Sequence, residues 1–114
     1  METIHLIARF KIHDGKQSEF KKWSKEVLAK TKNESPGPLY YEWFYNEAGT
    51  ECVVREAYKD SDAMFIHMGN LGELLGQGLA MADFFPEVYG NLSPELLAAA
   101  APLNPMIYTF DQGL

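Results

Sequence analysis

The sequence contains a single cysteine, Cys52, and lacks any run of the roughly 18 to 20 apolar residues needed to span a bilayer. One thiol cannot form a disulfide within the chain or a multi-thiolate zinc site, and such low cysteine use is typical of a reducing compartment. The amino terminus also lacks the cationic segment followed by an apolar run that marks an export signal. We therefore expect a cytoplasmic protein with no membrane anchor.

Positive charge is scarce as well, since 10 Lys and Arg stand against 16 Asp and Glu, for a formal net charge of −6. This balance repels phosphate backbones and anionic lipid headgroups, so we expect neither nucleic acid nor a membrane surface as partner. The three histidines, His5, His13 and His67, lack the i, i+4 spacing of a helical zinc site. No glycine-rich phosphate loop and no nucleophile elbow are present. The sequence thus predicts no metal site and no nucleotide cofactor.

The length of 114 residues and the 46% hydrophobic content favour one domain, residues 1–114, with its own core. Apolar residues alternate along 3–12, which predicts a strand, and recur every three or four positions along 16–33, which predicts an amphipathic helix. Two prolines and a glycine end that helix within 34–38. The segments 39–45 and 52–58 read as antiparallel strands joined by a short loop.

A second helix is expected after the capping residues of 60–62, with a break at its glycines, Gly72, Gly76 and Gly78. Beyond it the sequence predicts a helical turn over 79–84, an inserted strand over 86–90, a helix over 94–101 and a terminal strand over 106–110. This order indicates an α+β fold of the split βαβ type, with an antiparallel sheet, helices on one face and a C-terminal strand and helix extension.

The strand over 39–45 is apolar on both faces, because Tyr41 and Trp43 alternate with Tyr40 and Phe44. A strand of this kind is usually buried on both sides. A homodimer that packs sheet against sheet would cover the second face, and two-fold dimers are the commonest oligomers. The alternative is that the C-terminal segment folds back over its own sheet.

His67 is the ionisable residue with the most specific position, because it shares the inward stripe of the second helix with Met64, Met68 and Leu71. An imidazole in an apolar cleft stays neutral and can accept a proton at neutral pH. The alternative is a hydrogen-bonded core histidine without a catalytic role. The glutamates, Glu34 and Glu56 among them, are not paired in sequence and read as solvated or strand-edge charges without a role.

Aromatic residues make up 13% of the chain and suit a pocket for a flat, conjugated ligand, although each ring by itself is more often a packing residue. Several segments lead in order to His67, namely residues 7–12, 14–16, 19–20, 36–37, 41–44 and 54–63. Through these segments the sequence resembles the antibiotic biosynthesis monooxygenase family of the dimeric α+β barrel superfamily. The resemblance covers about residues 4–70. It implies a ferredoxin-like βαββαβ protomer, a homodimer whose sheets form a barrel, and a pocket between each sheet and its helices.

The resemblance further implies a cofactor-independent monooxygenase for a small aromatic, quinol-like or polyketide substrate, working without metal or flavin. His67 would be the catalytic proton acceptor, with Tyr41, Trp43 and Tyr58 as substrate-binding pocket walls or hydrogen-bond donors. The chain departs from many relatives where Leu71 and Gly72 replace a Pro-His pair. Two alternatives therefore stay open, namely an isomerase or aldehyde-handling enzyme that uses His67, and a non-catalytic module that binds a small molecule.

Overall fold

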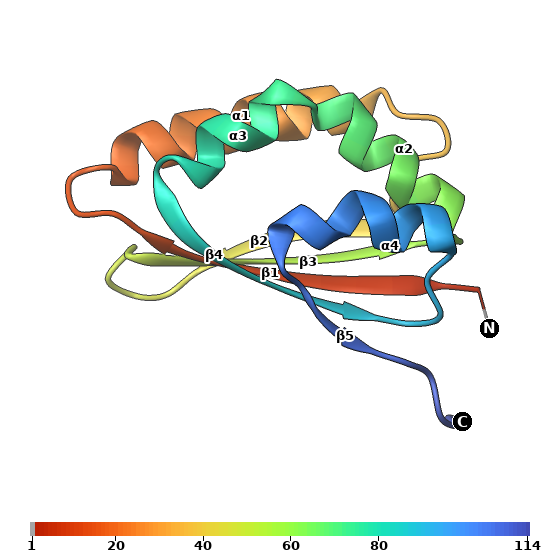
Figure 1. Cartoon of the computed structure of the whole chain (residues 1–114). Helices are drawn as coiled ribbons and strands as arrows, with labels where there is room; N and C mark the ends of the chain where they lie inside the picture. Colours follow the sequence, from red (N-terminus) through yellow and green to blue (C-terminus); the bar gives the residue numbers. More distant parts are fainter. Residues whose placement is uncertain (1) are drawn as a thin grey trace.

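The computed structural model describes residues 2–114. These residues fold into five strands, four α-helices and one 3₁₀ turn (Figure 1). The strands are β1 (Ile4–Ile12), β2 (Tyr40–Tyr45), β3 (Glu51–Tyr58), β4 (Ala82–Tyr89) and β5 (Met106–Tyr108). The helices are α1 (Gln17–Lys32), α2 (Ser61–Leu71), α3 (Glu73–Leu79) and α4 (Pro94–Ala100), followed by the 3₁₀ turn Ala101–Leu103.

The strands form one sheet in the order β2-β3-β1-β4-β5. β1 lies at the centre and pairs antiparallel with β3, where Ala8 lies opposite Val54, and with β4, where Ala8 lies opposite Pro86. β2 pairs antiparallel with β3, as expected for a hairpin. The first four strands with α1 and α2 make the ferredoxin-like βαββαβ arrangement predicted from the sequence, so the α+β fold class is confirmed.

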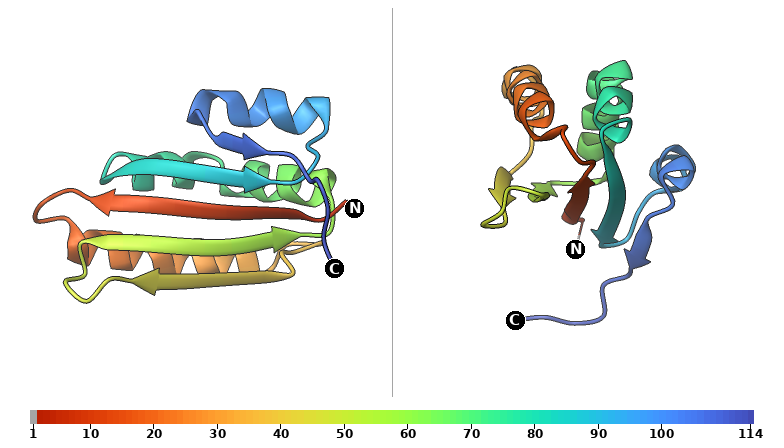
Figure 2. Two further views of the ribbon diagram at one scale, coloured as in Figure 1. Left: turned by 90° about the horizontal axis from the view of Figure 1, so that it is seen from below. Right: turned by 90° about the vertical axis from the view of Figure 1, so that its left-hand side faces the viewer.

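All of α1, α2 and α3 lie on one face of the sheet, and the other face carries no helix (Figure 1, Figure 2). The alternation along β1 explains this layering, because Ile4, Ala8 and Phe10 point toward the helices and are buried. Phe20 and Trp23 of α1 pack against Phe10 with ring centroids 5.2 and 5.8 Å apart. The core therefore lies between the sheet and the helical layer.

The glycine-rich region divides the second helical segment, as predicted. Gly72 ends α2 with a φ of 48°, a backbone conformation that glycine adopts readily, and α3 begins at the next residue. Gly78 of α3 faces Trp23, and a Cβ placed on Gly78 would come within 2.2 Å of the indole ring. The absence of a side chain at this position lets α3 approach α1 closely.

The prediction of a helical turn over 79–84 is wrong, because α3 ends at Leu79 and β4 already begins at Ala82. β4 is also longer than the strand predicted over 86–90, and it is the fourth strand of the βαββαβ unit rather than an insertion. Pairing along the whole of β1 overrides the local helical signal, and Phe84 and Phe85 are residues that favour strands. The alternation of buried Ala82, Pro86 and Val88 follows from this pairing.

The C-terminal extension consists of α4, the 3₁₀ turn and β5. Ser93 caps α4 by accepting a hydrogen bond from the backbone N–H of Leu96, and Pro94 occupies the first turn, as predicted. β5 is shorter than predicted and pairs parallel with β4 at the edge of the sheet. The extension lies beside the helical layer, and the segment after β5 passes one end of the sheet (Figure 2). It leaves most of the helix-free face uncovered.

The helix-free face is mixed rather than wholly apolar. Phe44 and Phe85 are 48% and 51% exposed on it. The same face carries two ion pairs, one joining Arg55 to Glu42 at 3.3 Å and the other joining Arg9 to Glu87 at 3.6 Å. The sheet thus offers two half-exposed rings among charges that are already paired within the chain.

Candidate functional site

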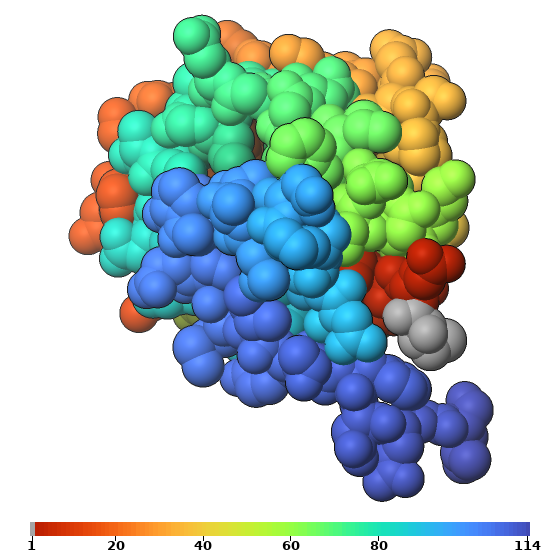
Figure 3. Space-filling view, turned by 45° about the vertical axis from the view of Figure 1, so that its right-hand side comes forward, coloured from red at the N-terminus to blue at the C-terminus, as the bar shows by residue number. Residues whose placement is uncertain are grey.

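A cavity of about 60 Å³ lies between the sheet and the helices. Its wall is almost wholly apolar and draws on β1 through Ala8, on α2 through Met64 and Met68, and on β4 through Phe84 and Pro86. The C-terminal extension closes one side through Ala100, Leu103 and Pro105. In the space-filling view α4 lies against α2 and covers this side of the molecule (Figure 3). The polar side chains in the cavity wall therefore lie in largely apolar surroundings.

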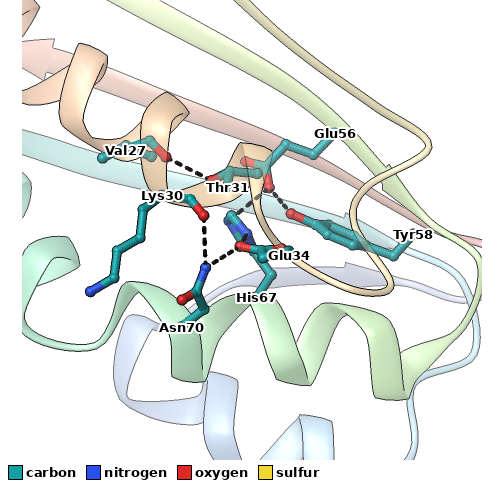
Figure 4. A network of polar contacts seen from close by, with 8 residues as sticks. All are labelled: Val27, Lys30, Thr31, Glu34, Glu56, Tyr58, His67 and Asn70. Carbon is teal, nitrogen blue, oxygen red and sulfur yellow. Dashed lines mark hydrogen bonds and ion pairs between the residues drawn. The ribbon is translucent and has the colours of Figure 1, made fainter.

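His67 and Glu34 form a buried pair beside this cavity (Figure 4). His67 comes from the inward face of α2, and Glu34 comes from the loop that follows α1. The distance between Nδ1 of His67 and Oε2 of Glu34 is 2.7 Å, and the two side chains are 5% and 2% exposed. The amide nitrogen of Asn70, one turn further along α2, donates a second hydrogen bond to Oε2 of Glu34 at 2.8 Å. Two donors from one helix thus hold the carboxylate in place.

This arrangement determines which nitrogen of the imidazole carries the proton. Because Oε2 of Glu34 accepts, Nδ1 of neutral His67 carries the hydrogen and Nε2 keeps a free electron pair. Burial lowers the pKa of His67, and the carboxylate of Glu34 opposes that shift. Burial has the larger effect, so the imidazole is neutral at neutral pH and its Nε2 can accept a proton.

Glu56 lies on the opposite side of the imidazole, on β3. Its Oε1 is 3.8 Å from Nε2 of His67 and accepts a hydrogen bond of 2.5 Å from the hydroxyl of Tyr58 (Figure 4). The residue is only 4% exposed, and burial raises the pKa of Glu56 to about 8. The hydroxyl of Tyr58 lowers that pKa and the charge of Glu34 raises it further. At neutral pH Glu56 is a neutral carboxylic acid.

The structure brings three of the four residues named from the sequence to the cavity, since His67, Tyr41 and Trp43 all contribute to its wall. The ring of Tyr41 meets that of His67 edge to face, with centroids 5.2 Å apart. Nε1 of Trp43 is buried without a hydrogen-bond partner among residues 2–114. Tyr58 is fully buried and is not part of the cavity wall, but it contacts the site through its hydroxyl on Glu56 and through its ring, whose centroid is 5.4 Å from that of His67.

The interpretation of Glu34 and Glu56 as solvated or strand-edge charges is wrong, because both side chains are buried against His67. The alternation along β3 does carry a signal for Glu56, which shares one face with the buried residues Val54 and Tyr58. Glu34 lies in a loop, where no periodicity indicates which side chains turn inward. Its position follows only from the packing of α1 against α2.

Two properties of the described chain bear on metals and membranes. No group of three His, Cys, Asp or Glu side chains within residues 2–114 is arranged to hold a metal ion. Over the same residues, the structure contains no helix of the length and apolarity required to cross a membrane.

Comparison with known proteins identifies the fold and a family. Residues 3–71 match the family model described as antibiotic biosynthesis monooxygenase. MupZ from Pseudomonas fluorescens has a similar structure, with a TM-score of 0.83 and 27% identity over 100% of this chain and 94% of MupZ. A conserved protein from Methanosarcina mazei superposes with a TM-score of 0.70 and 19% identity, covering 78% of this chain and 92% of its own.

SnoaB from Streptomyces nogalater, a cofactor-independent oxygenase, superposes with a TM-score of 0.68 at 16% identity, over 82% of this chain and 96% of SnoaB. No curated protein matches the sequence significantly. The family match ends at Leu71, so β4 and the C-terminal extension, which supply one side of the cavity wall, lie beyond it.

Proposed function

Because the chain belongs to the antibiotic biosynthesis monooxygenase family, we propose that it is a cofactor-independent monooxygenase for a small aromatic, quinol-like or polyketide compound. The observation that carries this proposal is the pair of His67 and Glu34 at an apolar cavity. A neutral imidazole whose free Nε2 lies in largely apolar surroundings is a suitable base for an acidic C–H or O–H group. Tyr41 and Trp43 provide aromatic surface against which a flat substrate packs.

The proposed reaction converts a CH₂ group flanked by aromatic rings, together with O₂, into a ketone and water. Nε2 of His67 removes one proton, and the resulting carbanion transfers one electron to O₂. The carbon radical and superoxide then combine to a peroxide anion, which takes the proton back from His67. Loss of the second hydrogen from carbon as a proton, with cleavage of the O–O bond, yields the C=O bond and a hydroxide ion, which that proton converts to water. An apolar pocket favours this sequence by excluding bulk water.

The cavity is smaller than a ring-sized ligand requires. Its volume is about 60 Å³, whereas a dry protein cavity that binds benzene has a volume of about 150 Å³. Met64 and Met68 are unbranched and can change rotamer, and Leu103 is the last residue of the 3₁₀ turn after α4. We propose that these side chains move when a substrate enters.

Oxygen uptake tests the proposed function. With a panel of anthrones and hydroquinones, we expect the purified protein to consume O₂ above the spontaneous rate, with incorporation of one atom from ¹⁸O₂ into a ketone product of the anthrones. A folded protein that binds members of the panel, as shown by a raised melting temperature, but consumes no O₂ would contradict the proposal. That result would favour the non-catalytic binding module.

We also propose that the protein is a homodimer that packs the helix-free faces of two sheets together. Half-exposed Phe44 and Phe85 lie on this face, and no segment within residues 2–114 covers most of it. Light scattering coupled to size exclusion should give about twice the chain mass of 12.9 kDa. A mass equal to that of one chain at micromolar concentration would exclude the dimer.

The buried thiol of Cys52 supports a reducing compartment, the cytoplasm, as the location.

A further inference from the structure

Glu56 is a buried carboxyl group without a cationic partner. Its side chain points from β3 toward the helices and lines the cavity. No lysine or arginine within the described residues forms an ion pair with it, and the titratable group that faces its Oε1 across 3.8 Å is the neutral imidazole of His67. An ionised carboxylate in such a place is strongly disfavoured, so the group retains its proton at neutral pH. The site therefore holds a proton donor as well as a proton acceptor.

The donor and the acceptor do not satisfy one another. Oε1 of Glu56 and Nε2 of His67 are 3.8 Å apart, which is beyond hydrogen-bond distance. Glu34 already engages the other nitrogen of the imidazole, and the hydroxyl of Tyr58 already donates to Glu56 (Figure 4). Glu34 and Tyr58 thus hold His67 and Glu56 side by side. Nε2 of His67 and the acidic proton of Glu56 stay available to a substrate.

We propose that Glu56 is a second catalytic residue, which protonates the carbonyl oxygen of the substrate while Nε2 of His67 removes a proton from the neighbouring carbon. The substrate class is then an enolisable carbonyl compound. This inference rests on the proposed function, because it takes His67 as the base, and it adds the acid and the chemistry of the group that is activated.

The spacing of the two groups fits such a substrate. With a C–C bond of about 1.52 Å and a C=O bond of about 1.23 Å, the α-carbon and the carbonyl oxygen are about 2.4 Å apart. Oε1 of Glu56 is 3.8 Å from Nε2 of His67 and accepts from Tyr58, so the acidic proton is on Oε2 of the same carboxyl group. A carbonyl compound lying over the pair can therefore approach Nε2 with its α-carbon and this carboxyl group with its oxygen.

The step is a redox-neutral enolisation. The α C–H bond breaks, its proton passes to Nε2 of His67, and its electron pair forms the C=C bond. The π electrons of the carbonyl move to oxygen, which takes the proton of Glu56. The new carboxylate is stabilised by the hydroxyl of Tyr58 and lies beside the new imidazolium, so no isolated charge is created. Where the substrate is such a ketone, the electron-rich enol takes the place of the carbanion as the species that reduces O₂ in the proposed function.

Hydrogen–deuterium exchange under anaerobic conditions tests the pair independently of oxygen chemistry. The probes are 2-tetralone, a fused aromatic ketone, and the smaller cyclohexanone, incubated in D₂O and followed by proton NMR. We expect the wild-type protein to accelerate α-exchange of at least one probe, and Glu56→Gln to reduce that acceleration by about 100-fold or more. Glu47→Gln, the same change in the exposed hairpin loop, should exchange like the wild type.

The pH profile separates a catalytic role from a merely structural one. The ionisable groups around Glu56 are His67 of α2, Glu34 of the loop after α1, Tyr41 of β2 and Tyr58 of β3. Burial raises the pKa of both tyrosines, so they stay neutral, and loss of the Glu56 proton should lower the exchange rate above about pH 8. Glu56→Gln should lack this alkaline decline. An unchanged rate or an unchanged alkaline limb in the variant overturns the proposal, as does the absence of exchange with both probes.

The result also distinguishes this inference from the monooxygenase proposal. If α-exchange depends on Glu56 but no anthrone or hydroquinone gives O₂ uptake, the acid–base pair is supported and the monooxygenase proposal is rejected. If O₂ uptake is the same in the wild type and in Glu56→Gln and no α-exchange occurs, the monooxygenase proposal is supported and the acid–base pair is rejected.

Discussion

Replacing His67 by glutamine is expected to lower turnover by about 100- to 10 000-fold, the usual contribution of a positioned general base. Glutamine retains an N–H that can donate to Glu34 and fills a similar volume, but its amide has no basic nitrogen in place of Nε2. The proton acceptor is thus removed while the buried carboxylate keeps a donor. The measurement is the initial rate of O₂ uptake, or of α-exchange, with the melting temperature recorded in parallel.

His13→Gln is the matched control, because His13 is exposed, its Nε2 contacts Asp83 at 3.0 Å, and neither residue lines the cavity. We expect this variant to retain the wild-type rate. A rate for His67→Gln equal to that of the control would reject His67 as the base, provided that both proteins melt as folded molecules.

Replacing Glu56 by glutamine is expected to remove most of the decline in stability between about pH 4.5 and pH 8. The pKa of Glu56 is raised from 4.5 to about 8 in the folded protein, because burial disfavours the carboxylate. Below pH 4.5 the group is protonated in both states and contributes no penalty. As the pH rises toward 8, only the unfolded chain releases the proton, so the free energy of unfolding falls by an amount on the order of several kcal/mol.

Glutamine is neutral throughout this range and can still accept the hydrogen bond from Tyr58. The variant should therefore be more stable than the wild type at pH 8.5 and similar to it at pH 5, as measured by urea denaturation. The pKa of His67 is lowered by burial, so its contribution is lost as the pH falls, but this effect is common to both proteins. A stability difference that stays the same at pH 5 and pH 8.5 would show that Glu56 is ionised in the folded state.

The inward stripe of the second helix could be predicted from its spacing, because residues three and four positions apart share one face of a helix whatever the rest of the chain does. Met64 and His67 both line the cavity in the structure. The alternation along β1 likewise predicted the apolar face that forms the floor of the core. Local periodicity was informative here because each of these segments buries one side only.

The same reasoning was wrong for 79–84, where the choice between helix and strand depended on pairing with β1, a segment about 70 residues earlier in the chain. A short apolar stretch that contains Met81, Phe84 and Phe85 is compatible with either structure. Hydrogen bonding to a distant strand decided between them, and no pattern within the stretch reports that partner.

The sequence by itself determined the α+β class, the helical face that carries His67 and the family, because these depend on the order and spacing of residues along single elements. Tertiary structure alone decided that Glu34, from a loop, and Glu56, from a strand, meet on the two sides of that imidazole. The pKa of a buried side chain depends on all the groups that surround it. In this site those groups come from β3, α1 and α2 together. For that reason the proton chemistry of this cavity follows from the packing of distant segments rather than from any motif.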